Sequence, residues 1–136
     1  MRSLFLSVCL GALATASAAW AQECDPNDDS QSMMTICAGV DYQTADAKLN
    51  QAYQELVRRN DQKTNQLLQT AQRAWITFRD AECTYSTAAS TGGSIHPMEV
   101  SLCLTALTNE RTKQLTSGSN CQESDSSCAS PDDGDN

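Results

Sequence analysis

The sequence is poor in aromatic and basic residues and contains a single histidine. Aromatic side chains make up 5% of the 136 residues, which leaves little bulk for a hydrophobic core. Nine Lys and Arg are scattered among 17 Asp and Glu, for a formal net charge of −8, so nucleic-acid binding through a basic stripe is not expected. His96 alone cannot form a histidine metal cluster or a histidine diad. We predict no metal site and no cofactor.

Motifs of the common enzyme classes are missing as well. The chain has no Walker loop, dinucleotide-binding fingerprint, zincin helix or Gly-x-Ser-x-Gly turn. Adjacent carboxylates, such as Asp28-Asp29 and Asp132-Asp133, fall in stretches expected to be flexible, which cannot hold them at the fixed separation that acid–base catalysis needs. We therefore predict a non-catalytic protein. The alternative, a small hydrolase or thiol enzyme, requires a free thiol or an essential His96.

Long hydrophobic runs are absent except at the N-terminus. Arg2, the apolar stretch Leu4–Ala16 and the small-x-small site Ala19–Ala21 predict a signal peptide over residues 1–21. The apolar run is shorter than the roughly 20 residues of a membrane span, and no later segment comes close. The sequence thus predicts no membrane span and a location in the periplasm of a Gram-negative bacterium or outside the cell.

Cysteine is the residue that the sequence has in excess. Loss of the signal peptide leaves an even set, which is typical of disulfides in an oxidising compartment: Cys24, Cys37, Cys83, Cys103, Cys121 and Cys128. Cys83 and Cys103 lie ten residues on either side of Gly93, so a helical hairpin that turns there brings them together. The pairs Cys24–Cys37 and Cys121–Cys128 are expected only from proximity in the sequence. No Cys-x-x-Cys occurs, which favours structural disulfides over a redox or metal site.

Apolar residues recur at steps of three and four through three stretches, about 32–59, 62–89 and 97–116. Gly39 is a possible break in the first stretch, so the pattern predicts three to four helices. The short connections favour antiparallel neighbours, that is, a small all-α antiparallel helical bundle stapled by disulfides over residues 22–116. Residues 117–136 are rich in Ser and Asp with almost no apolar side chains, which predicts a disordered acidic tail.

One face of the second predicted helix carries Gln72, Trp75 and Arg79 at steps of three or four. We interpret this group as structural, with Trp75 and Phe78 as the main core residues. Arg79 is expected to lie along them and to pair with Asp80, Glu82 or a carbonyl of a neighbouring helix. The alternative is that an exposed Trp–Arg pair anchors a binding partner.

The loop before the third helix contains Gly92, Gly93, Ser94 and His96. Its simplest interpretation is a turn in which both glycines adopt positive φ and His96 caps the following helix. The same four residues are the best candidates for a partner-binding loop that enters the cleft of another protein.

Several segments together resemble the N-terminal domain of the lysozyme inhibitor LprI family. They are Asp46–Tyr53, the pattern Gln72-x-x-Trp75-x-x-x-Arg79-Asp80-x-x-Cys83, Gly92–Ile95 and Cys103–Arg111, within roughly Cys24 to Leu115. The resemblance implies an exported all-helical domain with disulfides and, for the family's named member, inhibition of lysozyme. Gln72, Trp75, Arg79, Asp80 and Arg111 match the family pattern as structural positions.

From the net charge, the predicted export and this resemblance we predict lysozyme as the partner. Our hypothesis for the mechanism is occlusion of the active-site cleft, which either the Gly92–His96 loop or an acidic face enters. A competing hypothesis is a general periplasmic protein-interaction or envelope-stress module unrelated to lysozyme. The predicted mature charge of −9 divides into −5 for the last 20 residues and −4 for the remainder, so attraction to a basic partner rests on a modest charge. The sequence does not predict the oligomeric state.

Overall fold

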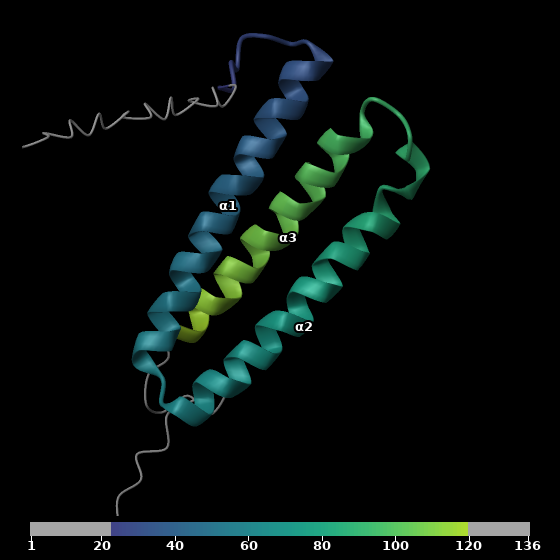
Figure 1. The fold of residues 1–136 in the computed structure, drawn as a ribbon. Coiled ribbons are helices and arrows are strands. Elements are labelled where there is room, and N and C mark those ends of the chain that lie inside the picture. Colours follow the sequence, from purple (N-terminus) through teal and green to yellow (C-terminus); the bar gives the residue numbers. More distant parts are fainter. Residues whose placement is uncertain (1–22, 120–136) are drawn as a thin grey trace, which may run out of the picture.

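The computed structural model describes residues 23–119 as three long helices and one short 3₁₀ helix (Figure 1). Helix α1 spans Gln31–Arg59, α2 Gln62–Ser86, η1 Ala88–Ser90 and α3 His96–Ser119. No strand occurs among these residues, and the all-α prediction is confirmed. The predicted signal peptide and the pair Cys121–Cys128 lie outside the described residues. Nothing in the part described is both long and apolar enough to cross a membrane as a helix.

Side-chain caps set the starts of the first two helices. The Ser30 hydroxyl accepts a hydrogen bond from the Met33 N–H at 3.3 Å, and Asp61 Oδ1 accepts one from the Thr64 N–H at 2.6 Å. Gly39 lies within an unbroken α1, because a helical glycine weakens a helix without ending it. The number of long helices is therefore three.

Two helix ends differ from the predicted ones. Helix α2 stops at Ser86 rather than near residue 89, because Thr87 leaves the helical conformation and its hydroxyl donates to the Cys83 carbonyl at 2.7 Å. Helix α3 continues to Ser119, three residues into the stretch predicted as tail, and the burial of Leu115 helps to hold its last turns against the bundle.

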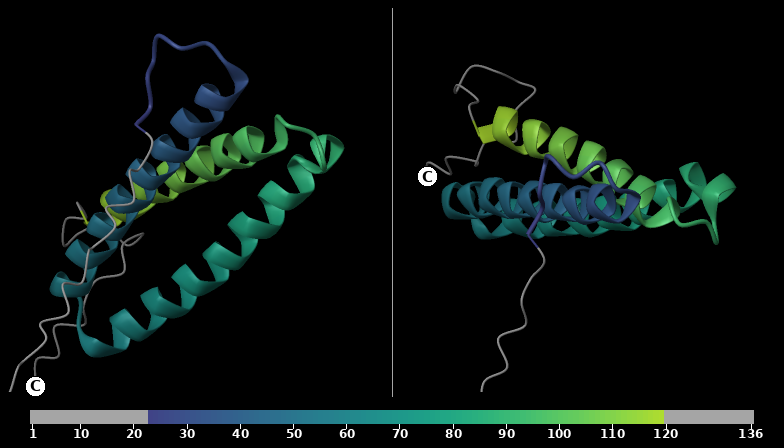
Figure 2. Two further views of the ribbon diagram at one scale, coloured as in Figure 1. Left: turned by 45° about the horizontal axis from the view of Figure 1, so that its top comes forward. Right: turned by 90° about the horizontal axis from the view of Figure 1, so that it is seen from above.

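Helix α2 runs antiparallel to both other helices, so α1 and α3 run in the same direction (Figures 1 and 2). The most extensive packing is between α1 and α3, whereas α2 leans away and meets α3 mainly towards the end where η1 joins them. The small core consists of apolar residues from all three helices, namely Ala38, Ala45, Leu49, Cys83 and Leu115. Thr108 on α3 is also completely buried.

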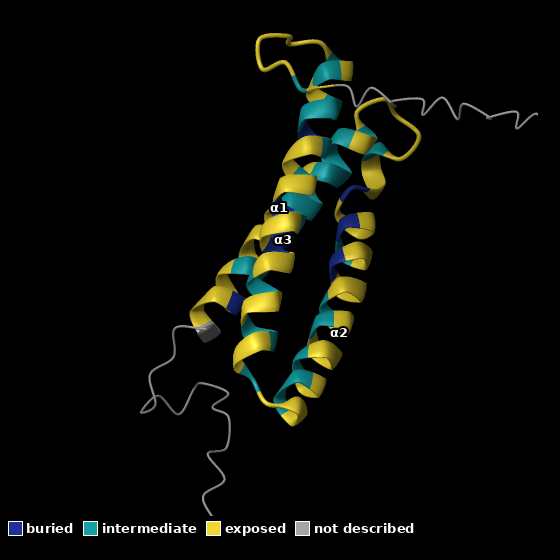
Figure 3. Ribbon diagram, turned by 60° about the vertical axis from the view of Figure 1, so that its left-hand side comes forward, coloured by how far each residue is buried: buried dark blue, intermediate teal, exposed yellow. Residues whose placement is uncertain are grey.

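Part of the expected apolar face of α2 points to solvent, although Trp75 is half-buried. Phe78 is 55% exposed and Tyr85 78% exposed, so the prediction that Phe78 is a core residue was wrong. The buried positions of α2 are Arg79 and Cys83, on the side that faces the other two helices (Figure 3). This rotation about the helix axis follows from the bond between Cys83 and Cys103 and from the contacts of Arg79 with α1.

Two disulfides staple the bundle, and both join cysteines that were expected to pair. Cys83 and Cys103 link α2 to α3 with their Cα atoms 5.6 Å apart. Cys24 and Cys37 tie the segment before α1 to that helix, with a Cα separation of 4.7 Å. The first link fixes the base of the loop that leads into α3.

Candidate functional site

A cluster of arginine and aromatic side chains joins α2 to both other helices. The guanidinium carbon of Arg79 lies 5.2 Å from the centroid of the Trp75 ring and 5.6 Å from that of Tyr42 on α1. Arg111 of α3 lies 5.9 Å from the same Trp75 ring, and its Nε donates to Gln72 Oε1 at 3.0 Å. Burial lowers the pKa of the Arg111 guanidinium, although such a group remains charged at neutral pH.

Arg79 is buried, so its charge requires partners inside the protein. Its Nη2 lies 2.8 Å and its Nε 2.9 Å from Asp80 Oδ1, which is the expected neighbour on the same helix. Asp46 of α1 is a second partner, and its Oδ1 lies 3.9 Å from Arg79 Nη1. The sequence pattern did not indicate this pair. The charge of Arg79 is thus paired within the bundle, in a geometry that holds helices together.

The loop between α2 and α3 is held by its own hydrogen bonds. The Gly93 N–H donates to the Ser90 carbonyl at 2.8 Å, and the Ser90 hydroxyl lies 3.0 Å from His96 Nδ1. Gly92 has a φ of +82°, whereas the expected positive φ at Gly93 was wrong. Gly93 is constrained sterically instead, because a Cβ there would lie 3.0 Å from the Ser90 carbonyl oxygen. His96 begins α3, and its ring bonds back to η1.

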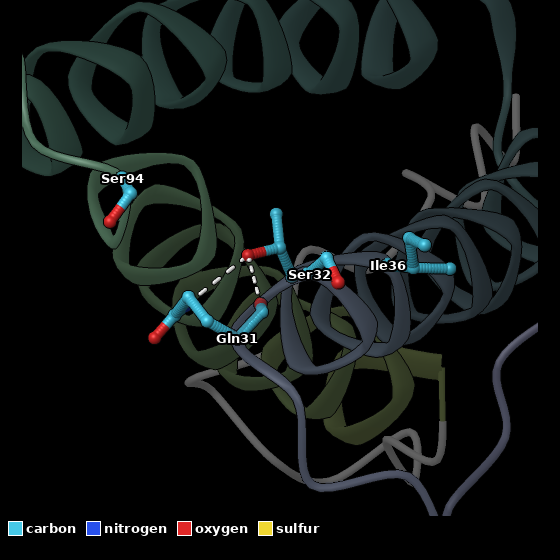
Figure 4. A pocket seen from close by; sticks show the side chains of 5 residues that line it. Gln31, Ser32, Ile36 and Ser94 are labelled. Carbon is cyan, nitrogen blue, oxygen red and sulfur yellow. Dashed lines mark hydrogen bonds between the residues drawn. The ribbon is translucent and has the colours of Figure 1, made fainter.

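Ser94 brings this loop next to the first turns of α1. It lines an open hollow of about 640 Å³ together with Gln31, Ser32, Thr35 and Ile36 (Figure 4). Within the hollow the Thr35 hydroxyl donates to the Gln31 carbonyl at 2.9 Å, and the Gln31 amide donates to the Thr35 hydroxyl at 3.4 Å. The loop and the start of α1 therefore form one surface, which we call the tip: residues 87–96 with residues 31–36.

Charge is divided unevenly along the bundle, and the contact between Arg79 and Asp46 marks the level of the division. On the side of the tip, residues 23–46 and 79–102 carry nine carboxylates and one basic side chain, a net −8. The opposite half, residues 47–78 and 103–119, carries seven basic and three acidic side chains, a net +4. The basic residues of the described part are thus concentrated at one end, and the expectation that they are scattered was wrong.

The loop itself carries no formal charge. Residues 83–98 contain no Asp, Glu, Lys or Arg. The acidic side chains begin at its borders, at Glu82 and Glu99, and continue at the start of α1 with Asp28 and Asp29. Hydrogen bonds from Ser30 stabilise the charged form of the Asp28 carboxyl and lower its pKa. We call these four residues the acidic collar.

All four loop residues were predicted from the sequence, whereas the acidic collar was not. Two residues of the collar could have been placed from the sequence, because an antiparallel hairpin of the second and third helices brings Glu82 and Glu99 to the same end. Asp28 and Asp29 join them only because α1 and α3 run in the same direction. Among residues 23–119, no group of three or more His, Cys, Asp or Glu is arranged to hold a metal ion.

The fold and this tip define a class of protein: a small helical bundle, stapled by disulfides, that presents a constrained loop at one end. Comparison with known proteins supplies the family. A family model described as "Lysozyme inhibitor LprI" matches residues 21–115, and the chain belongs to that family. The resemblance read from the sequence motifs is thereby confirmed.

Similar proteins are found in several bacteria. "Uncharacterized protein R02472" of Rhizobium meliloti (strain 1021) is 39% identical over 99 residues, which cover 63% of this chain and 71% of that protein. "Uncharacterized protein YecT" of Escherichia coli (strain K12) is 30% identical over 111 residues, 71% of this chain and 68% of that protein. A crystal structure of a DUF1311 family protein from Pseudomonas putida KT2440 superposes with a TM-score of 0.63 at 25% identity, covering 70% of this chain and 97% of that one.

Proposed function

We propose that this protein is an exported, non-catalytic binding protein that inhibits lysozyme by placing the loop Gly92–His96 in the active-site cleft. The observation that carries the proposal is the uncharged, constrained loop bordered by an acidic collar, in a chain of the LprI family. Two disulfides are in keeping with export to an oxidising compartment.

The distribution of charge suits a lysozyme. Glycoside hydrolases act with carboxylates inside the cleft, and a carboxylate on an inserted loop would be repelled by them. The loop brings none, since residues 83–98 carry no acidic side chain. Many lysozymes are strongly basic outside the cleft, so the acidic collar and the −8 half of the bundle attract the rim and speed association.

The internal bonds of the loop favour tight binding. A loop that is already ordered loses little conformational entropy when it enters a cleft. Here Cys83–Cys103 fixes the base of the loop, the positive φ of Gly92 makes its turn, and the contact between Ser90 and His96 closes it onto α3. The hollow beside Ser94 gives a second surface, on α1, for the rim of the partner.

The test is a lysis assay with lysozymes of several types and purified protein at micromolar concentration. We expect inhibition, and we expect Ser94→Glu to raise the concentration for half-inhibition at least tenfold by bringing a carboxylate into an acidic cleft. Gln51→Glu adds the same charge on the exposed side of α1, outside the tip, and is expected to inhibit as the unmodified protein does.

Two negative outcomes have different meanings. Unaltered lysis by every lysozyme tested removes lysozyme as the partner, and capture of a different envelope protein on the immobilised chain then favours the general interaction module. Inhibition that Ser94→Glu leaves unchanged keeps lysozyme as the partner and removes the loop from the contact.

A further inference from the structure

Helix α2 has an apolar face that no other described residue covers. Its members follow one another at alternating steps of four and three, and all are exposed: Leu67, Ala71, Ala74, Phe78, Ala81 and Tyr85. Leu67 is 65% exposed, as against 55% for Phe78 and 78% for Tyr85. Alternating steps of four and three are the heptad spacing with which one helix packs along another. We call these six residues the α2 stripe.

Removing one edge of the stripe from water costs little free energy of desolvation. Thr70, Thr77 and Thr84 lie along one edge, and each hydroxyl donates to the carbonyl of the residue four positions earlier, at 2.9, 3.1 and 2.8 Å. Because these donors are satisfied inside the helix, a partner that covers the threonines need not replace their hydrogen bonds. Soluble monomers rarely leave so continuous an apolar face uncovered.

We propose that the α2 stripe is a dimer interface, occupied by α2 of a second copy of this chain in antiparallel orientation. When the helices are aligned with matched heptads, Phe78 lies opposite Ala74 of the second copy and Tyr85 opposite its Leu67. Ala71 lies opposite Ala81, so the phenylalanines meet small residues and the alanines allow the two backbones to approach closely. The arrangement has two-fold symmetry and closes at two copies.

The charge of the bundle selects the antiparallel orientation. Side by side in opposite directions, the −8 half of each copy adjoins the +4 half of the other, whereas parallel copies place like charges together. The electrostatic and the apolar arguments therefore favour the same pairing.

The size of the stripe sets the expected strength of the dimer. Stable, specific interfaces bury about 800 Å² on each partner, and a single face of one helix lies near or below this size. We therefore expect a dissociation constant in the micromolar range. In this dimer the two tips point in opposite directions and remain accessible, so the inference does not depend on the proposed function.

Sedimentation equilibrium of the purified protein, from low micromolar to millimolar concentration, tests the proposal. We expect the weight-average mass to approach that of two chains, and Phe78→Glu to raise the dissociation constant at least tenfold because it buries an unpaired carboxylate against Ala74 of the second copy. Leu102→Glu is the matched control: Leu102 is 49% exposed on α3, off the stripe, and its substitution is expected to leave the dimer intact. Far-UV circular dichroism establishes that each variant folds.

Disulfide trapping tests the orientation separately. Chains with Ala71→Cys and chains with Ala81→Cys are expected to crosslink efficiently when mixed, because these positions face each other in the antiparallel pair. Either variant alone is expected to crosslink poorly, since its two new thiols lie several helical turns apart. A parallel pair gives the reverse result.

Three results overturn the proposal. One is a monomer at every concentration. Another is a dimer that Leu102→Glu disrupts and Phe78→Glu does not. The third is efficient crosslinking of each cysteine variant with itself but not in the mixture.

Discussion

The guanidinium carbon of Arg79 lies 5.2 Å from the centroid of the Trp75 ring, one turn earlier on α2. We expect Arg79→Lys to lower the free energy of unfolding by about 1–2 kcal/mol, because an ammonium group cannot combine the aromatic contacts with the two bonds to Asp80. Urea titration followed by circular dichroism measures the change. Arg73→Lys, at an exposed arginine of the same helix, is the control and should have little effect; equal losses would contradict the role given to Arg79.

Thr108 is completely buried on α3, and its hydroxyl oxygen makes no hydrogen bond with the described residues. Thr108→Val keeps the shape and removes the unsatisfied group, so we expect the free energy of unfolding to rise by about 1 kcal/mol. At Thr105 the hydroxyl donates to the Ser101 carbonyl at 2.8 Å, so Thr105→Val should bring no such gain. Urea titrations of both variants decide between these results, and a loss of stability in Thr108→Val would show that the hydroxyl is satisfied in solution.

Gly92 and Gly39 make a matched pair of glycines. Alanine at Gly92 must adopt a φ of +82°, and we expect it to cost about 1–2 kcal/mol. Alanine at Gly39, inside α1 with nothing within 4 Å of the added carbon, should instead stabilise by about 0.5–1 kcal/mol. Thermal unfolding compares them, and a Gly92→Ala protein as stable as the unmodified chain would show that the loop relaxes to another conformation.

The two disulfides are expected to differ in their effect on stability. Replacing Cys83 and Cys103 by alanine should cost about 2–4 kcal/mol, because the bond closes a 20-residue separation between two packed helices. Cys24 and Cys37 tie down an exposed segment, which gains freedom in the folded protein too when released, so their double substitution should cost less. The melting temperatures of the two double variants measure the difference. A larger loss on replacing Cys24 and Cys37 than on replacing Cys83 and Cys103 would contradict the prediction.

The cap of α2 adds a dependence of stability on pH. The Thr64 N–H donates to Asp61 and lowers the pKa of that carboxyl below its usual 3.8. Because the pKa is lower in the folded protein, the stabilisation is complete above about pH 4 and is lost as the pH falls through the folded value. Asp61→Asn keeps the acceptor but does not titrate, so its melting temperature should fall less steeply in acid. Asp41→Asn, at a carboxylate that caps no helix, should retain the slope of the unmodified protein, and equal slopes in all three would contradict the prediction.

Periodicity and turn residues were enough to predict the three helices, their order and the pairing of Cys83 with Cys103. They could not determine which face of α2 is buried, because Trp75 and Phe78 lie on two neighbouring apolar stripes with the same spacing. The choice depends on tertiary contacts, chiefly those of Arg79 with Tyr42 and Asp46, which are distant in sequence. The candidate loop could be predicted from its glycines, whereas the collar required knowledge of helix direction.

Helices α1 and α3 form the most extensive contact in the bundle, yet the whole of α2 separates them in the chain. Contacts between such distant segments form slowly, since a long intervening stretch must first be brought into place. The side of α1 that carries Ala38, Ala45 and Leu49 has little to pack against until α3 arrives. We therefore expect folding to be completed only when α3 packs against α1, and the chain to stay open to proteases until then.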